Sequence, residues 1–263
     1  MAVSFPIPFL QRKLSTINYY RLPAYFLPFR NDDGNFLSDT TFEKIHRIYE
    51  FNRELRSLLF SAIESIEIAL RARISYLHGL RYGALGYLDS ANFNVRHNTD
   101  RFLENIQREI TSNRNVPFVQ HHQQKYHGNF PVWVITELFT FGMLSYFYSD
   151  LLTQDQKAIA RQYNTSHTVL KSWLRCCTDA RNICAHYGRL YYRVFSAAPA
   201  GFNLSTGVRW RMWAVMLVIK ALYPSPQKWR EEFVPRTEKL FQKYADDIEL
   251  YHLGFPRDWK AHL

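Results

Sequence analysis

The stretch TTFEKIHRIYEFNRELRSLLFSAIESIEIALRARISYL, residues 40–77, decides the fold class of this chain. Its apolar side chains recur mainly every three or four residues, as they do on one face of an α-helix. Thr40 and Glu43 have the spacing of a capping box, which marks a helix start. The stretch therefore predicts one long amphipathic helix or two stacked ones.

Helical periodicity also dominates the rest of the chain, and no strand-like alternation of useful length competes with it. Ser225 stands where it would cap a helix, and Thr153 with Gln156 has the spacing of a second capping box. Further helices are predicted over residues 100–112, from Pro131 to about Leu152, from His167 to about Tyr187 with Gly188 ending it, over 207–222, and over 226–244. Residues 190–205 form the clearest irregular stretch.

The composition is that of a globular protein, with 47% hydrophobic and 21% charged residues in 263. That much apolar surface can offset the entropy of the chain, which excludes a disordered class. We find no linker rich in Pro, Ser or Gly and no internal repeat. The sequence predicts an all-α helical bundle that forms a single domain over residues 1–263, with an N-terminal extension over residues 1–38.

The positive charge is concentrated in one segment. The whole chain carries a formal net charge of +10, and residues 156–230 hold twelve Lys or Arg against one acid, Asp179, a net +11. The remainder of the chain is therefore close to neutral. A block of one sign indicates a polyanionic partner, either nucleic acid or an anionic membrane, and nucleic acid is the first hypothesis.

The start of the chain and its apolar stretches favour a cytoplasmic protein without a membrane span. The first fifteen residues, MAVSFPIPFLQRKLS, lack the apolar run of a secretory signal. Residues 212–219 are apolar but far too few to cross a bilayer, and residues 130–148 are interrupted by polar side chains. We therefore predict no membrane partner.

The sequence gives little support for a metal site or for disulfide bonds. Cys176, Cys177 and Cys184 are odd in number and form no Cys-x-x-Cys pair, so we expect reduced, partly buried thiols in a helix. The histidines of VQHHQQKYHG, residues 119–128, have no Asp, Glu or Cys between them. We predict no metal site and no cofactor.

The basic segment contains the string Arg181-Asn182-Ile183-Cys184-Ala185-His186. An Arg followed by a His after four to six residues is a ribonuclease signature in one helical superfamily. Spacing alone selects nothing, because other pairs such as Arg73 with His78 share it. Arg181 differs in its context: an amide follows it, the other face of its helix is apolar, and the basic segment surrounds it.

Helical geometry places part of this motif on a polar seam. At 100° per residue, Arg175, Asp179, Asn182 and His186 fall within about 60° of one another on a core helix. In a purely structural interpretation, Arg175 pairs with Asp179 while Asn182 and His186 satisfy each other or a nearby carbonyl. Arg181 lies about 140° from His186, so their convergence requires the long Arg side chain, the end of the helix or a second protomer.

The segment RNICAHYGRLYYR, residues 181–193, resembles the RN-x-x-AH-x-x-RL segment of the bacterial abortive infection proteins of the Abi-like family (the AbiD/AbiF group), whose helical domain belongs to the HEPN superfamily. The resemblance extends over nearly the whole chain. It includes Tyr19-Tyr20-Arg21-Leu22, Tyr25, Pro28-Phe29-Arg30, Asn52-Arg53-Glu54-Leu55-Arg56, Ile66-Glu67, Leu70-Arg71, Pro131-Val132-Trp133, Glu137, Phe141-Gly142, Gly254-Phe255-Pro256 and Asp258-Trp259. Fewer residues precede Tyr19 than the family leads us to expect, and Tyr191-Tyr192 stand where it often has an aromatic-Asn pair.

The resemblance implies phage defence by a toxin-like, metal-independent endoribonuclease that acts as a homodimer, with two motifs facing one cleft. In such an enzyme the 2′-hydroxyl of RNA attacks the adjacent phosphate. His186 suits proton transfer near neutral pH, Arg181 can stabilise the developing phosphate charge, and Asn182 would position the histidine or the phosphate. The expected contacts to the RNA backbone are Arg175, Arg189 and Arg193.

Three alternatives stay open at this stage. The chain could be a nuclease-inactive module that holds a structured RNA, such as a small antitoxin RNA, or it could act at an anionic membrane. Arg73 with His78 could form a rival second site. The aromatic side chains in the basic segment could stack on unpaired bases, although core packing is favoured for the Trp pair. These aromatic residues are Trp210, Trp213, Tyr191 and Tyr192.

Overall fold

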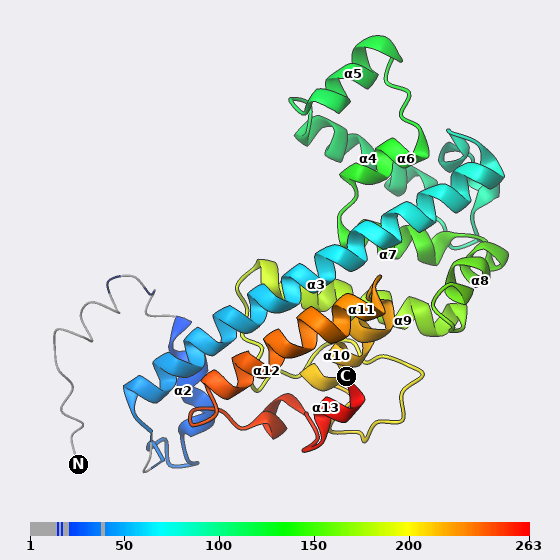
Figure 1. The fold of residues 1–263 in the computed structure, drawn as a ribbon. Helices are drawn as coiled ribbons and strands as arrows, with labels where there is room; N and C mark the ends of the chain where they lie inside the picture. The colour runs from blue at the N-terminus through cyan, green and yellow to red at the C-terminus, as the bar shows by residue number, and fades with distance from the viewer. Residues whose placement is uncertain (1–14, 16, 18–20, 38–39) are drawn as a thin grey trace.

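The computed structural model describes residues 15, 17, 21–37 and 40–263, and this part of the chain is all-α (Figure 1). The predicted fold class is confirmed. Among the described residues there is no β-strand, and only two isolated β-bridges, Arg30–Phe36 and Phe93–Leu151. The predicted N-terminal extension falls partly on residues 1–14, 16, 18–20 and 38, which lie outside the described residues.

One helix, α3 (Phe42–Tyr82), is the spine of the molecule. It is a single helix of 41 residues, not two stacked ones. Its cap is Thr41, whose Oγ1 accepts from the Lys44 amide at 3.1 Å, so the predicted cap at Thr40 is wrong by one residue. The helix ends at Gly83, where φ is +78°, a conformation that glycine adopts without strain.

The buried face of α3 forms the centre of the hydrophobic core. Every third or fourth side chain along it is fully buried, as the periodicity predicts. Six helices pack against it: α6 (Val132–Ile135), α7 (Phe141–Asp150), α8 (Thr153–Arg161), α9 (His167–Ala185), α10 (Met212–Leu222) and α12 (Val234–Lys243). At the C-terminal half of α3 lie α4 (Thr99–Ser112) and α5 (Pro117–Lys125), and two short 3₁₀ turns, Gly86–Leu88 and Ser90–Asn92, follow α3 directly. At its N-terminal half lie α2 (Pro23–Phe26) and the 3₁₀ turn Leu27–Phe29.

The helix predicted from Pro131 to about Leu152 is wrong as one element. It is divided into α6 (Val132–Ile135), a 3₁₀ turn (Thr136–Leu138) and α7 (Phe141–Asp150). Phe139 has extended backbone, its carbonyl accepts from Arg71 at 2.8 Å, and Thr140 starts a new helix by accepting from the Met143 amide. A contact from α3 therefore sets a break that the local apolar pattern hides.

Helix α8 (Thr153–Arg161) follows immediately, and its predicted capping box is not formed. Thr153 is the first helical residue, and its side chain does not cap. Gln156 instead donates to the carbonyls of Ser149 and Leu151, at 2.8 and 2.9 Å. It thereby helps to satisfy carbonyl groups at the C-terminal end of α7, which have no partner within the helix itself.

The C-terminal helices agree with the sequence except at one boundary. Helix α10 (Met212–Leu222) begins five residues later than predicted, because residues 206–210 form turns. Ser225 caps α11 (Pro226–Lys228) as predicted, accepting from the Lys228 amide at 3.2 Å. A π-turn, Trp229–Phe233, then leads into α12 (Val234–Lys243), where Pro235 cannot donate to the preceding turn.

The chain ends with a 3₁₀ turn, Leu250–Leu253, and α13 (Trp259–His262), which pack beside α10 and α12. The Trp229 indole nitrogen donates to the carbonyl of Leu263 at 2.8 Å, which fixes the end of the chain to the core. In the described part of the chain, no helix is long and apolar enough to cross a membrane.

Candidate functional site

The motif lies at the C-terminal end of α9 (His167–Ala185). Ser166 caps the helix, accepting from the Val169 amide at 3.3 Å, and one face is buried throughout. The helix ends at Ala185, two residues before the predicted end, and Gly188 closes the turn that follows: its amide donates to the Ile183 carbonyl at 2.7 Å, and a Cβ on Gly188 would lie 2.9 Å from an Ile183 methyl carbon. The left-handed residue of this turn is Tyr187, with φ of +58°.

Arg181 points toward α3. It lines a cleft of about 400 Å³, and its guanidinium carbon lies 5.8 Å from the centre of the Phe60 ring. Its Nε is buried and has no hydrogen-bond partner among the described residues. The position follows from the helical angle, which sets Arg181 on a different face from His186.

In a single chain, the cleft around Arg181 is lined by more acidic than basic side chains. Glu64, Glu67 and Glu137 line it, against the guanidinium groups of Arg71 and Arg181. Arg71 is engaged, since it donates to Glu67 at 2.8 Å and lies 3.5 Å from Glu137. A phosphate would meet more negative than positive charge here, so a single chain does not form a phosphate site at Arg181.

Asn182 is exposed on another face of α9. It lines a cleft of about 260 Å³ between α9 and α7, together with Lys171, Arg175 and Asp179. The predicted polar seam therefore exists as far as Asn182 and opens into a cleft. The cleft is closed on one side by Ser196, from the irregular stretch after the motif.

The structural pairing considered for this seam does not form. Asp179 accepts from the backbone nitrogen and the hydroxyl of Ser196, at 3.0 and 2.8 Å, and so fixes the irregular stretch against α9. Within the described part of the chain, Arg175 takes part in no ion pair. Its exposed guanidinium remains available to a ligand.

His186 is the residue that ends α9, and its side chain is exposed. Its backbone nitrogen donates to the Asn182 carbonyl at 2.9 Å, but no hydrogen bond joins the imidazole to any described residue. Asn182 and His186 therefore do not satisfy each other. The structure leaves this histidine open to solvent, separate from the cleft that holds Arg181.

The two other arginines expected to contact RNA are both half-buried, and one of them is engaged within the fold. Arg189 is half-buried and donates to the Ala24 carbonyl, which ties α2 to the loop after the motif, and burial lowers the pKa of Arg189. Arg193 is also half-buried, with an Nε that has no partner among the described residues. Arg189 thus supports the fold around the motif directly.

Two buried polar residues of α3 hold the loop after the motif. The Asn52 side-chain oxygen accepts from the amides of Leu190 and Tyr191 at 2.8 and 2.9 Å, and Arg56 donates to the Gly188 carbonyl at 3.1 Å. Neither role was predicted from the sequence. The sequence feature that could indicate such a role is a pair of polar side chains, four residues apart, within the buried stripe of a helix.

Most of the remaining candidates are core residues. Trp213 is 4% exposed, which confirms core packing, whereas Trp210 at 36% exposed does not belong to the core. His78 is buried against aromatic rings, so the pair with Arg73 is not an accessible site. The three cysteines are free and buried, and burial raises the pKa of both Cys176 and Cys184 to about 12.

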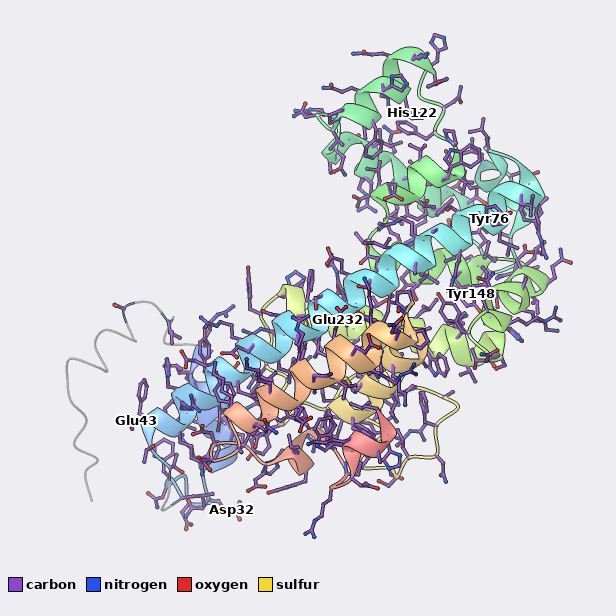
Figure 2. All side chains as sticks on the ribbon, viewed as in Figure 1. Asp32, Glu43, Tyr76, His122, Tyr148 and Glu232 are labelled. Atoms are coloured by element: carbon purple, nitrogen blue, oxygen red, sulfur yellow. The ribbon has the colours of Figure 1, made fainter. Side chains whose placement is uncertain are left out.

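The histidine-rich segment lies on and after α5. His122 is labelled in Figure 2, and its ring stacks on that of Phe130. The Nδ1 of His122 is 2.8 Å from the Phe118 carbonyl. His121 and His127 are exposed. Among the described residues, no group of three or more potential ligands is arranged to hold a metal ion.

The fold and this site define an all-α protein whose Arg-Asn…His motif ends a central helix. The family model described as "Abi-like protein" matches residues 12–192, more than half of the chain. The chain therefore belongs to the Abi-like protein family, and this membership points to a role in abortive infection, a defence against phage. The comparison with curated proteins and that with solved structures each found no match.

Proposed function

We propose that this Abi-like protein is a metal-independent endoribonuclease of the HEPN type, in which the 2′-hydroxyl of RNA attacks the adjacent phosphate. The observation that supports this most is the state of Asn182 and His186 at the end of α9. Polar side chains that hold a fold together are buried and bonded within it. Asn182 and His186 are instead exposed and make no side-chain hydrogen bond within the described residues, so the fold does not engage either of them. Two polar groups of a sequence motif are thus free to meet a substrate.

His186 would transfer the proton of the 2′-hydroxyl or of the leaving oxygen. Histidine is the side chain most often used to accept and to donate protons in catalysis close to neutral pH. Arg181 would donate to the phosphate oxygens as their charge grows, and Asn182 would orient the phosphate or the histidine.

A homodimer is part of the proposal, because Arg181 and His186 do not share a cleft within one chain. A second copy would have to bring its His186 to the Arg181 cleft and shift the charge balance there. Exposed apolar side chains of the kind that mark interfaces lie on α3 at that cleft, where Phe60 and Ile68 line it, and further along the helix, where Tyr76 is labelled in Figure 2. These are Phe60 at 39%, Ile68 at 60%, Tyr76 at 72% and Leu80 at 70% exposed.

The first test is cleavage of total RNA by the wild type and by two variants. We expect His186→Ala to lose about 10²- to 10⁴-fold and Arg181→Ala about 10²- to 10³-fold. His127→Ala and Arg114→Ala remove exposed residues of the same types outside the motif and serve as matched controls. DNA of the same sequence should not be cut, because it lacks the 2′-hydroxyl.

Mixing the two inactive variants tests whether the site is shared. If Arg181 of one protomer acts with His186 of the other, a mixed dimer has one intact site of two, so a random mixture recovers about a quarter of wild-type activity. If both residues acted within one chain, the mixture would recover nothing. Equal cleavage by the wild type and both single variants would remove these residues from catalysis and refute the proposal.

A further inference from the structure

Tyr146 is a large aromatic side chain that the fold leaves outside the core. It lies on α7, is 74% exposed, and lines two separate clefts, one on each side of the helix. Neighbouring aromatic residues of α7, such as Phe147 and Tyr148, are buried. The exposed ring is therefore a projection on the surface and not an edge of the core.

The first of these clefts is the one that holds Asn182. Besides that amide it presents Lys171 and Arg175, both exposed and neither in an ion pair within the described residues. Its one carboxylate, Asp179, is bonded to Ser196. The cleft thus offers two free cations and one free amide within a single groove that leads to the motif.

The second cleft, about 300 Å³, lies on the other side of Tyr146, between α7 and the start of α4. It presents Arg96 and Arg101, again exposed and outside every ion pair of the described residues. Its carboxylate, Asp150, is 3.1 Å from the Nδ1 of His97. Across both clefts, four unpaired basic side chains face two carboxylates that already have partners in the protein.

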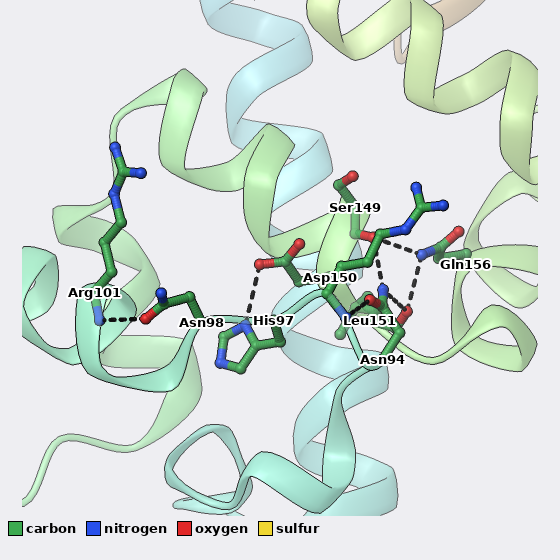
Figure 3. Close-up of polar contacts among 9 residues, drawn as sticks. Asn94, His97, Asn98, Arg101, Ser149, Asp150, Leu151 and Gln156 are labelled. Carbon is green, nitrogen blue, oxygen red and sulfur yellow. Dashed lines mark hydrogen bonds and ion pairs between the residues drawn. The ribbon is translucent and has the colours of Figure 1, made fainter.

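The loop that carries Arg96 is fixed to the end of α7 (Figure 3). The Asn94 side-chain nitrogen donates to the carbonyls of Ser149 and Leu151, at 2.9 and 3.1 Å. The backbone nitrogen of Asn94 donates to the Asp150 carbonyl at 2.8 Å. Asn98 then caps α4 by accepting from the Arg101 amide at 2.9 Å. The backbone bearing both arginines is therefore already placed beside Tyr146 without a ligand, which lowers the ordering cost of binding.

We propose that these two clefts and Tyr146 bind a single-stranded segment of RNA that crosses α7, an inference that rests on the proposed function. One base stacks on the Tyr146 ring. Arg96 and Arg101 contact phosphates on one side of it, and Lys171 and Arg175 contact phosphates on the other. The strand leaves the first cleft at Asn182 and so reaches the motif at the end of α9.

The arrangement fits an unpaired strand and not a duplex. Proteins that bind single strands combine a positively charged groove with aromatic rings on which bases stack, and only an unstacked base can reach such a ring. The Asn182 amide can donate to and accept from the edge of an unpaired base. Three of the residues, Tyr146, Arg96 and Arg101, lie outside the basic segment of the sequence.

Binding is measured apart from cleavage with a fluorescein-labelled 12-nucleotide RNA that is 2′-O-methylated throughout and so lacks the nucleophile. In fluorescence anisotropy, Tyr146→Ala should weaken binding by about 5- to 100-fold, the effect of removing one stacking ring, whereas Tyr146→Phe should stay close to wild type. Arg101→Gln and Lys171→Gln should each reduce the slope of log K against log salt by about 0.7.

Two exposed residues elsewhere give matched controls. Tyr251→Ala removes a ring that is 65% exposed, and Lys239→Gln removes an exposed charge on α12, and neither should change binding. Thermal unfolding checks that Tyr146→Ala folds. Wild-type binding that is unchanged by Tyr146→Ala, or equally tight binding of the duplex, would overturn the RNA path. Binding with the expected losses but no cleavage of unmodified RNA would support the path and refute the proposed nuclease.

Discussion

Removing the Asn52 side chain tests how the fold holds the loop that follows the motif. Asn52 is fully buried, and its oxygen is the acceptor for two backbone amides, those of Leu190 and Tyr191. Its nitrogen donates to the Ile48 carbonyl at 2.9 Å. Asn52→Ala leaves both amides without a partner in a place that water does not reach.

The magnitude follows from those contacts. Each buried donor left without a partner costs about 1 to 3 kcal/mol, and two are affected here, so the free energy of unfolding should fall by about 2 to 6 kcal/mol. Arg56 still holds the Gly188 carbonyl, which favours the lower half of this range. Urea unfolding followed by circular dichroism gives the change as a shift in midpoint.

The matched control lies on the same helix. Ser57 is exposed and its hydroxyl donates only to the Arg53 carbonyl, so Ser57→Ala should change stability by less than about 0.5 kcal/mol. Hydrogen exchange provides an independent measurement, since the amides of Leu190 and Tyr191 should be strongly protected in the wild type and exchange faster in Asn52→Ala. A loss below about 1 kcal/mol, with both amides still protected, would refute this role for Asn52.

Two further predictions concern buried ionisable groups. Burial lowers the pKa of His78 to about 4, so below pH 6.5 the unfolded chain binds a proton that the folded chain does not, and stability falls by up to about 3 kcal/mol as the pH drops toward 4. Urea midpoints between pH 4.5 and 7.5 should show this dependence, and His78→Phe should flatten it; an equal slope in both proteins would refute the assignment. Asp155 is 1% exposed, forms an ion pair with Arg81 and accepts from the Tyr82 hydroxyl at 2.6 Å, so Asp155→Asn should cost about 1.5 to 3 kcal/mol. Asp246→Asn, at an exposed carboxylate, is the control, and equal midpoints for the two variants would contradict the role of Asp155 in joining α3 to α8.

The long helices could be predicted from the sequence because their apolar period is strong and local. Helices α3 and α9 follow from side chains three and four residues apart, and the angle between Arg181 and His186 on α9 gave their separation correctly. The break at Phe139 could not be predicted in this way. It depends on Arg71, which is 68 residues away in the sequence.

The candidate site shows the same division between local and long-range information. The Arg181 to His186 string and its place at a helix end could be read from the sequence. The use of Arg189 could not, because its partner is the Ala24 carbonyl in an element far away in the chain. The contacts of Asn52 and Arg56 with the loop could not be predicted for the same reason, although the sequence shows that both are polar side chains on a buried stripe.

The fold determines which of the positive charges in the sequence are available to a polyanion. Several basic side chains of the segment 156–230 are engaged internally: Arg189 with Ala24, Arg211 with the Tyr192 carbonyl at 2.9 Å, and Lys220 with the His262 carbonyl at 2.6 Å. Hydrogen-bonded cations at fixed positions hold the loop and the C-terminus, and they are less free to follow a phosphate backbone. The unpaired cations beside Tyr146 come instead from two sources, this segment and the loop at Arg96. The proposed RNA path therefore uses a surface that the fold assembles from neutral and basic parts of the sequence, and the position of this surface over α7 follows from the packing of α7 between α4 and α9.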